Sequence, residues 1–231
     1  MARRKAPTKD ESALLPPFAA LPDQAIHVPS SDAEFEQARE ALTRASVLGF
    51  DTESKPLFQV GAKDTGPHVV QFATVDAAWL LQTHHAAAQA ITREILGNPR
   101  ILKVGFGLDN DRHQLQGRLQ VEMQNVLDLD RVFKRHGFGA STGVRAAIAM
   151  VLGQSLRKSK KVTTSNWANP RLTDSQRRYA ANDAHAAAMV HAHLPAWEAL
   201  QPPVPAQRPP RPPRPAADAG NSTNSTIERR M

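Results

Sequence analysis

The chain has 231 residues, of which 41% are hydrophobic, so it can form one sizeable core with tails. Its formal net charge is +7, but the stretch after residue 200 holds five arginines against two acids, which leaves the body only mildly basic. That balance is compatible with a polyanionic partner. The absence of cysteine excludes disulfides and thiolate metal sites. With no long apolar run for a secretory signal or a membrane span, the sequence predicts a cytoplasmic protein.

The first 50 residues predict an arm, an edge strand and a helix. Residues 1–24 are charged and then interrupted by prolines, and we expect a disordered arm without its own core. Residues 25–28 can form an edge strand. Residues 30–42 predict a helix, because Ser and Asp caps precede Phe35, Ala38 and Leu42 at helical spacing.

Residues 45–53 predict a buried strand that ends in two acids. Leu48 and Phe50 are apolar, and Asp51 and Glu53 follow without a break. Positions two apart on a strand share a face, so both carboxylates emerge together. They repel each other unless one is protonated or a cation lies between them, and hard oxygen ligands suit Mg²⁺ or Mn²⁺. The alternative is an exposed strand end with two ordinary acids.

The rest of the chain predicts paired strands followed by alternating helices and strands. A tight turn joins strands at 68–74 and 77–81, which extend the acidic strand into a meander. The remaining predicted elements are a helix at 87–96, a strand at 101–106, a helix at 110–119, a strand at 121–127, helices at 128–133 and 141–152, a basic loop at 157–161, and a helix at 173–194. This pattern predicts an α/β fold with a mixed sheet. Residues 199–231, rich in Pro and Arg, predict a disordered tail.

Further carboxylates follow elsewhere in the sequence. Asp111 starts the helix after the strand at 101–106, with Asp109 as a rival two residues earlier, and either could simply cap that helix. Tyr179 and Asp183 are four apart, hence on one face of the last helix. Alanines surround this pair, which allows a close approach to another element.

Three segments together resemble a known family. They are 48–53 (LGFDTE), 103–115 (KVGFGLDNDRHQL), and 165–167 with 179–184 (SNW and YAANDA). In order and spacing they resemble the motifs of the DEDDy 3′–5′ exonucleases, the group containing ribonuclease D and the Werner-syndrome exonuclease domain. The resemblance covers roughly residues 25–198, the predicted exonuclease domain. It implies a ribonuclease H-like fold: a mixed five-stranded sheet in the order 3-2-1-4-5, flanked by helices.

The resemblance also implies roles for the acids and for the tyrosine. The implied ligands of two Mg²⁺ or Mn²⁺ ions are Asp51, Glu53, Asp111 and Asp183. Tyr179 matches the tyrosine that orients the attacking water, and the family spacing Asp-x-x-x-Leu selects Asp111 over Asp109. The implied reaction is hydrolysis of DNA or RNA from a single-stranded or frayed 3′ end, which releases nucleoside 5′-monophosphates.

A further group of residues is expected near the substrate. These residues are Thr52, Lys55, Leu57, Phe106, Lys158, Lys160 and Lys161. Phe106 has a core role as its alternative, and the lysines have a solvated loop as theirs. Trp167 is expected to be a packing anchor.

Two other function classes compete with the exonuclease. One is a nucleic-acid-binding protein that kept the fold without cleaving, and the other is a phosphodiesterase for dinucleotides or small molecules. Unlike in ribonuclease D and the Werner protein, we expect neither an additional helical domain nor a helicase here, so the choice between DNA and RNA stays open.

Overall fold

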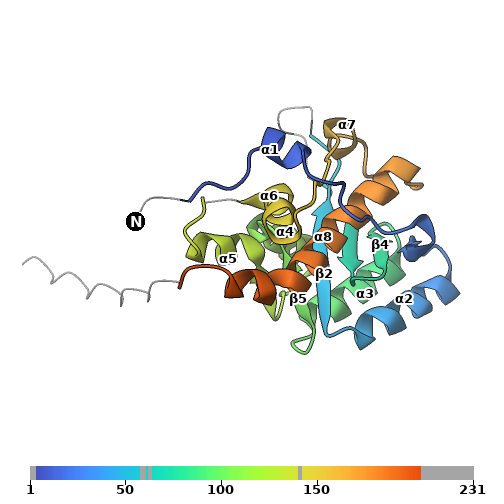
Figure 1. Ribbon diagram of the computed structural model, residues 1–231. Coiled ribbons are helices and arrows are strands. Elements are labelled where there is room, and N and C mark those ends of the chain that lie inside the picture. Colours follow the sequence, from blue (N-terminus) through green and yellow to red (C-terminus); the bar gives the residue numbers. More distant parts are fainter. Residues whose placement is uncertain (1–3, 58–60, 62–63, 140–141, 204–231) are drawn as a thin grey trace, which may run out of the picture.

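The computed structural model describes residues 4–57, 61, 64–139 and 142–203. Apart from residues 199–203, the predicted tail lies outside this part of the chain. A six-stranded sheet in the order β1-β4-β3-β2-β5-β6 forms the centre (Figure 1). Its strands are β1 (Ile26–His27), β2 (Val47–Glu53), β3 (Val69–Ala73), β4 (Ala78–Gln82), β5 (Leu102–Gly105) and β6 (Val126–Asp128).

The sheet is mixed, as predicted. β2, β3 and β4 form the antiparallel meander, whereas β5 and β6 follow β2 in parallel. Counted from the acidic strand β2, these five strands have the predicted order. The predicted number of strands is one too few, because the short strand β1 pairs in parallel with β4 and belongs to the same sheet.

Helices cover both faces of the sheet. Their bounds are α1 (Lys9–Ala13), α2 (Asp32–Arg44), α3 (Ala86–Gly97), α4 (Asp109–Leu119), α5 (Leu129–Arg135), α6 (Gly143–Leu152), α7 (Lys160–Thr163) and α8 (Asp174–Ala199), with a 3₁₀ turn at Asp23–Ala25. Helices α2, α3 and α4 pack on one face in a single apolar cluster with Leu48 and Phe50. The long helix α8 crosses the other face, with α5 and α6 beside it (Figure 1).

The alternation along β2 explains how α8 comes so close. Leu48 and Phe50 are buried against the first layer, and Gly49 faces α8. A Cβ atom at Gly49 would overlap the Ala184 carbonyl oxygen and lie 2.8 Å from the Ala188 backbone nitrogen. The missing side chain therefore lets the α8 backbone lie directly against the central strand, next to its acidic end.

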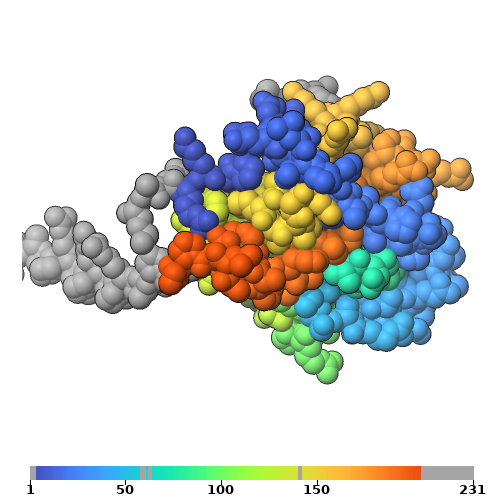
Figure 2. All heavy atoms as spheres, in the orientation of Figure 1, coloured from blue at the N-terminus to red at the C-terminus, as the bar shows by residue number. Residues whose placement is uncertain are grey.

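The expected N-terminal arm is packed on the fold within residues 4–24. Phe18 and Leu21 are buried in two different core clusters, and the Phe18 N–H donates to the Ser155 carbonyl at 3.0 Å. Figure 2 shows this segment, in blue, lying over helix α6, in yellow. The prediction of disorder is wrong here because widely spaced apolar residues can each bury in a core formed by other segments.

Three other segments differ from the prediction by more than two residues or by an additional element. The predicted strand at 121–127 is only Val126–Asp128, and the buried Val121 and Met123 precede it without strand pairing. The predicted basic loop leads into α7, which begins at Lys160. The last helix runs beyond 194 to Ala199, with Pro195 inside it. Among the described residues, no helix combines the length and the apolar character needed to cross a membrane.

Candidate active site

The acidic end of β2 lies in the middle of the sheet, beneath α8. Asp51 and Glu53 share the face of Gly49, so they point toward the helix layer that Gly49 contacts. Both are only partly exposed. The Asp51 carboxylate accepts a hydrogen bond from the Thr52 backbone N–H at 2.9 Å. Two carboxylates are thus fixed on rigid backbone at the end of a covered strand.

Helix α8 brings Asp183 and Tyr179 to the same place. Asp183 is 5% exposed, and Tyr179 lies one turn earlier on the same helix face. The Tyr179 oxygen accepts a hydrogen bond from Thr163 Oγ1 at 2.8 Å. Trp167 is fully buried, its ring centroid lies 5.9 Å from that of Tyr179, and its indole N–H donates to the Thr163 carbonyl at 3.2 Å. The expectation that Trp167 is a packing anchor is confirmed.

Asp111 reaches the site from the first turn of α4. The Thr52 hydroxyl, which leaves β2 on the face opposite Asp51, donates a hydrogen bond to Asp111 Oδ1. Thr52, expected near the substrate, therefore joins the acid on α4 to the central strand. The rival Asp109 lies elsewhere: its side chain is 73% exposed and accepts from Arg131 at 3.1 Å. The geometry favours Asp111.

Lys158 inserts its ammonium group into this acidic cluster. Its Nζ lies 2.8 Å from Asp183 Oδ2 and 5.2 Å from the centroid of the Tyr179 ring, and its side chain is 26% exposed. Burial alone would lower the pKa of Lys158, but the Asp183 and Asp51 carboxylates outweigh that effect and raise it. The lysine therefore stays charged. It contacts Asp183, a candidate metal ligand, and its ammonium group is not exposed on the loop where it could bind a substrate phosphate.

Burial and mutual repulsion disfavour full ionisation of the acids. Burial, and then the charges of Asp183 and Asp111, raise the pKa of Asp51. Burial, followed by the charge of Asp51, raises the pKa of Glu53 to about 9. Burial likewise raises the pKa of Asp111 and of Asp183, although Lys158 acts in the opposite direction on Asp183. In the absence of further positive charge, this cluster holds protons at neutral pH.

The donor chemistry of the cluster fits hard divalent cations. Four carboxylates supply oxygen ligands and enough negative charge for two such ions. As they stand, however, no three acid or histidine side chains in the described ranges are arranged to hold one ion. Asp183 is paired with Lys158, and Asp111 accepts from Thr52. A cation that binds Asp183 Oδ2 must therefore displace the Lys158 ammonium.

Comparison with known families assigns the chain. The family model described as 3′-5′ exonuclease matches residues 26–196. The chain belongs to this 3′–5′ exonuclease family. The DEDDy resemblance of the three motifs and the ribonuclease H-like fold are both confirmed.

Two relatives are much longer than this chain. The mouse bifunctional 3′-5′ exonuclease/ATP-dependent helicase WRN is 28% identical over 186 residues, which is 77% of this chain and 13% of that protein. The human exonuclease mut-7 homolog is 27% identical over 202 residues, 75% of this chain and 23% of that one. The chain thus spans less than a quarter of either relative.

Solved structures share the fold at low identity. The EXO domain of Aedes aegypti Nibbler superposes with a TM-score of 0.66 at 22% identity, covering 78% of this chain and 91% of that one. Escherichia coli RNase D gives a TM-score of 0.64 at 20% identity, covering 75% of this chain and 45% of that one.

The other residues expected near the substrate follow β2 or lie on α7. Lys55 follows β2, and its backbone N–H donates to His68 Nδ1 at 3.2 Å. Leu57, in the same segment, is 46% exposed. Lys160 and Lys161 are exposed on α7, and neither forms an ion pair with any described residue.

Phe106 lies in the core layer. Its ring stacks on Phe133 with centroids 6.5 Å apart and borders the apolar cluster beneath α5 and α8. This packing fits the core role that was its alternative; the ring is only partly buried, and a contact with the substrate stays a prediction.

Gln71 is a residue of this site that sequence reasoning missed. It lies directly opposite Asp51 in the β2–β3 register and is fully buried. Neither its amide oxygen nor its amide nitrogen has a hydrogen-bond partner among the described residues. The sequence could have indicated it, because Gln71 is the one polar residue within the otherwise apolar strand Val69–Ala73. Thr163 and Gly49 offered no comparable signal.

Proposed function

We propose that this chain is a metal-dependent 3′–5′ exonuclease that hydrolyses phosphodiester bonds of DNA or RNA from the 3′ end and releases nucleoside 5′-monophosphates. One observation carries the proposal. Asp51 and Glu53 on β2, Asp183 on α8 and Asp111 on α4 lie close enough together for their charges to act on one another, within the fold of a 3′–5′ exonuclease family.

We assign these four carboxylates as ligands of two divalent ions, Mg²⁺ or Mn²⁺, because such metal dependence is general in the family. Bound there, the ions would activate a water, stabilise the leaving 3′ oxygen and neutralise the phosphate. The protein contributes rigidity. Strand β2 fixes Asp51 and Glu53, the close packing of α8 on Gly49 fixes Asp183, and the Thr52 hydroxyl holds Asp111.

We assign Tyr179 to orienting the attacking water. Burial, and then the nearby Asp183 charge, raise the pKa of its phenol, so it stays protonated at neutral pH and acts as a donor rather than as a base. Thr163 donates to the phenol oxygen, and the phenol in turn forms a hydrogen bond with the Asp183 carboxylate, so Tyr179 already acts as a donor inside the cluster. A fixed hydrogen-bond donor is the role that suits this geometry.

The substrate we propose is nucleic acid with a single-stranded or frayed 3′ end. One related structure, Trypanosoma brucei RNase D, is a complex with RNA U12, at a TM-score of 0.65 and 20% identity. In the present chain, Lys55 and the exposed Leu57 lie just beyond Glu53, where a terminal nucleotide would enter.

The absence of cysteine fits a reducing compartment, and the cytoplasmic location stays a prediction.

A gel time course tests this proposal. DNA and RNA labelled at the 3′ or the 5′ end, from dinucleotides to long oligonucleotides, would be incubated with Mg²⁺, Mn²⁺ or EDTA. We expect a metal-dependent ladder from the 3′ end, reduced by at least about 10³-fold in Asp51→Ala. Asp109→Ala, which removes the exposed rival acid, should retain cleavage.

Two outcomes would overturn the proposal. Intact substrates under every metal condition, with strand binding, would indicate a binding protein that does not cleave. Cleavage confined to dinucleotides or small phosphodiesters would indicate the phosphodiesterase. Equal loss of activity in Asp51→Ala and Asp109→Ala would refute the assignment of ligands.

A further inference from the structure

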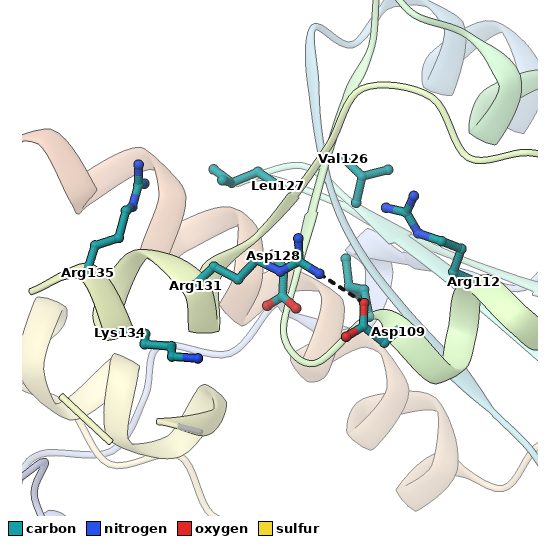
Figure 3. Close-up of a pocket in the computed structure, with 9 residues that line it drawn as sticks. Asp109, Arg112, Val126, Leu127, Asp128, Arg131, Lys134 and Arg135 are labelled. Atoms are coloured by element: carbon teal, nitrogen blue, oxygen red, sulfur yellow. Dashed lines mark hydrogen bonds and ion pairs between the residues drawn. The ribbon is translucent and has the colours of Figure 1, made fainter. Parts of the chain in front are cut away.

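A second charged feature lies on the β6 edge of the sheet. It is a pocket of about 550 Å³ between the start of α4 and helix α5 (Figure 3). Apolar side chains line part of it: Leu108, which is buried, and Val126 and Leu127, which are partly exposed on β6. β6 is the last strand of the sheet, so its outer edge is open to the pocket.

Four exposed cations surround this apolar lining. Arg112 comes from α4, and Arg131, Lys134 and Arg135 come from α5 (Figure 3). Arg131 pairs with Asp109. In the part of the chain that the structure describes, no acid lies within ion-pair distance of the other three.

The second acid of the pocket is engaged by backbone groups. Asp128 Oδ1 accepts from the N–H groups of Gly107 at 3.1 Å and Asp130 at 3.0 Å, so it caps the start of α5. The pocket thus keeps a surplus of positive charge that its own acids do not neutralise. Surplus charge of this kind around a concave surface attracts anions.

The pocket lies next to the candidate active site. Asp109, on its border, and Asp111, in the acid cluster, belong to the same first turn of α4. A chain that ends at the acids therefore needs only to pass the first turn of α4 to reach the pocket.

We propose that this pocket binds the substrate strand upstream of the scissile bond, with a base lying across the edge of β6, where Val126 and Leu127 flank it from opposite faces of the sheet, and backbone phosphates on Lys134, Arg135 and Arg112. The inference rests on the proposed exonuclease function and adds a second binding region to it. A nucleotide unit combines a flat apolar base with a phosphate anion, and the pocket offers both complements side by side. Isolated surface lysines without an apolar lining would give only diffuse attraction.

The first test is strand binding without cleavage. Fluorescence anisotropy in EDTA would measure 5′-labelled single strands of increasing length on the full chain, on Lys134→Ala/Arg135→Ala, and on the control Arg44→Ala/Arg100→Ala. The control removes the same charge from exposed arginines that precede β2 and β5, at the end of the sheet opposite the acids. Arg112 is left intact because it adjoins Asp111.

We expect the pocket variant to bind long strands about three- to tenfold more weakly, and the control to bind like wild type. The dependence of log K on log salt concentration should flatten by about 0.7 for each phosphate that no longer meets a cation, or about 1.4 for the pair. Dinucleotides, too short to reach the pocket, should show no difference. Thermal unfolding should show that both variants stay folded.

The second test is cleavage with Mg²⁺. The pocket variant should show a raised KM for long strands, an unchanged kcat, and unchanged kinetics on dinucleotides. If wild type cleaves and the pocket variant matches the control at every length, the pocket proposal is overturned while the exonuclease stands. If wild type cleaves nothing, the exonuclease fails, and the anisotropy comparison alone decides whether the pocket binds strands.

Discussion

The acid cluster and the basic pocket lie on either side of the first turn of α4, yet their charges behave differently. The four carboxylates are at least partly buried and repel one another, and Glu53 has a pKa of about 9. The cations of the pocket are exposed, and only Arg131 among them has a described acidic partner. Burial makes the carboxylates responsive to protons and metal ions, whereas exposure leaves the pocket with weak, salt-screened attraction.

The sheet itself produces this difference. Helix α8 lies directly on β2, because Gly49 has no side chain that would hold the helix away. The acids on that strand are therefore enclosed. β6 is an edge strand, and side chains beside it remain accessible. We therefore expect single changes in the cluster to act strongly on chemistry and stability, and changes in the pocket to act modestly on strand binding.

After Asp51→Ala, the largest expected effect on catalysis comes from removing one oxygen atom in the enclosed region. Tyr179→Phe should lower kcat by about 10²–10³-fold with less than about a threefold change in KM. Removing one fixed hydrogen-bond donor from a buried site lowers the rate by about this factor. Single-turnover kinetics on labelled oligonucleotides would measure it. A decrease no larger than that of Lys134→Ala/Arg135→Ala would break the contrast between the two regions.

The close packing that encloses the acids should be costly to disturb. Gly49→Ala should lower the free energy of unfolding by about 1–3 kcal/mol or more, because the new methyl group overlaps the Ala184 carbonyl. Urea denaturation would measure it. The matched control is Gly117→Ala in α4, where nothing lies within 4 Å and a gain of about 0.5–1 kcal/mol is expected. Equal effects at both glycines would refute the close approach of α8.

Lys158 provides a test of the internal cation. Lys158→Met should lower Tm in EDTA at neutral pH, because the four acids lose the ammonium that Asp183 contacts. Mg²⁺ should then raise Tm more in the variant than in wild type, since no lysine has to be displaced. Lys160→Met, on exposed α7, is the control. Identical Tm values for both variants, with and without Mg²⁺, would exclude this role.

The last prediction concerns pH. Glu53 has a pKa of about 9 in the folded protein against an ordinary 4.5. Between these values the unfolded chain releases a proton that the folded one holds, so metal-free stability falls as pH rises from 4.5 to 9. Glu53→Gln should flatten this fall. Tm in EDTA across that range would show it, at about 2–4 °C per kcal/mol. Parallel curves for variant and wild type would contradict the raised pKa.

Several features of this molecule followed from local pattern. The spacing of Asp51 and Glu53 on the predicted strand indicated that both acids share one face of β2, because strand geometry has a fixed period. The spacing of Tyr179 and Asp183 predicted a shared face on α8 for the same reason. The order of strands needed the family resemblance in addition.

What the sequence by itself determined is therefore the set of acids, the tyrosine and the elements that carry them. Only the tertiary structure decided their partners: Lys158 on Asp183, Thr52 on Asp111 across 59 positions, and Gln71 opposite Asp51. It also decided that residues 4–24 pack on the body, and that cations from two helices surround one pocket. Local periodicity acts over a few residues, whereas these contacts depend on how distant segments are brought together by burying one shared core.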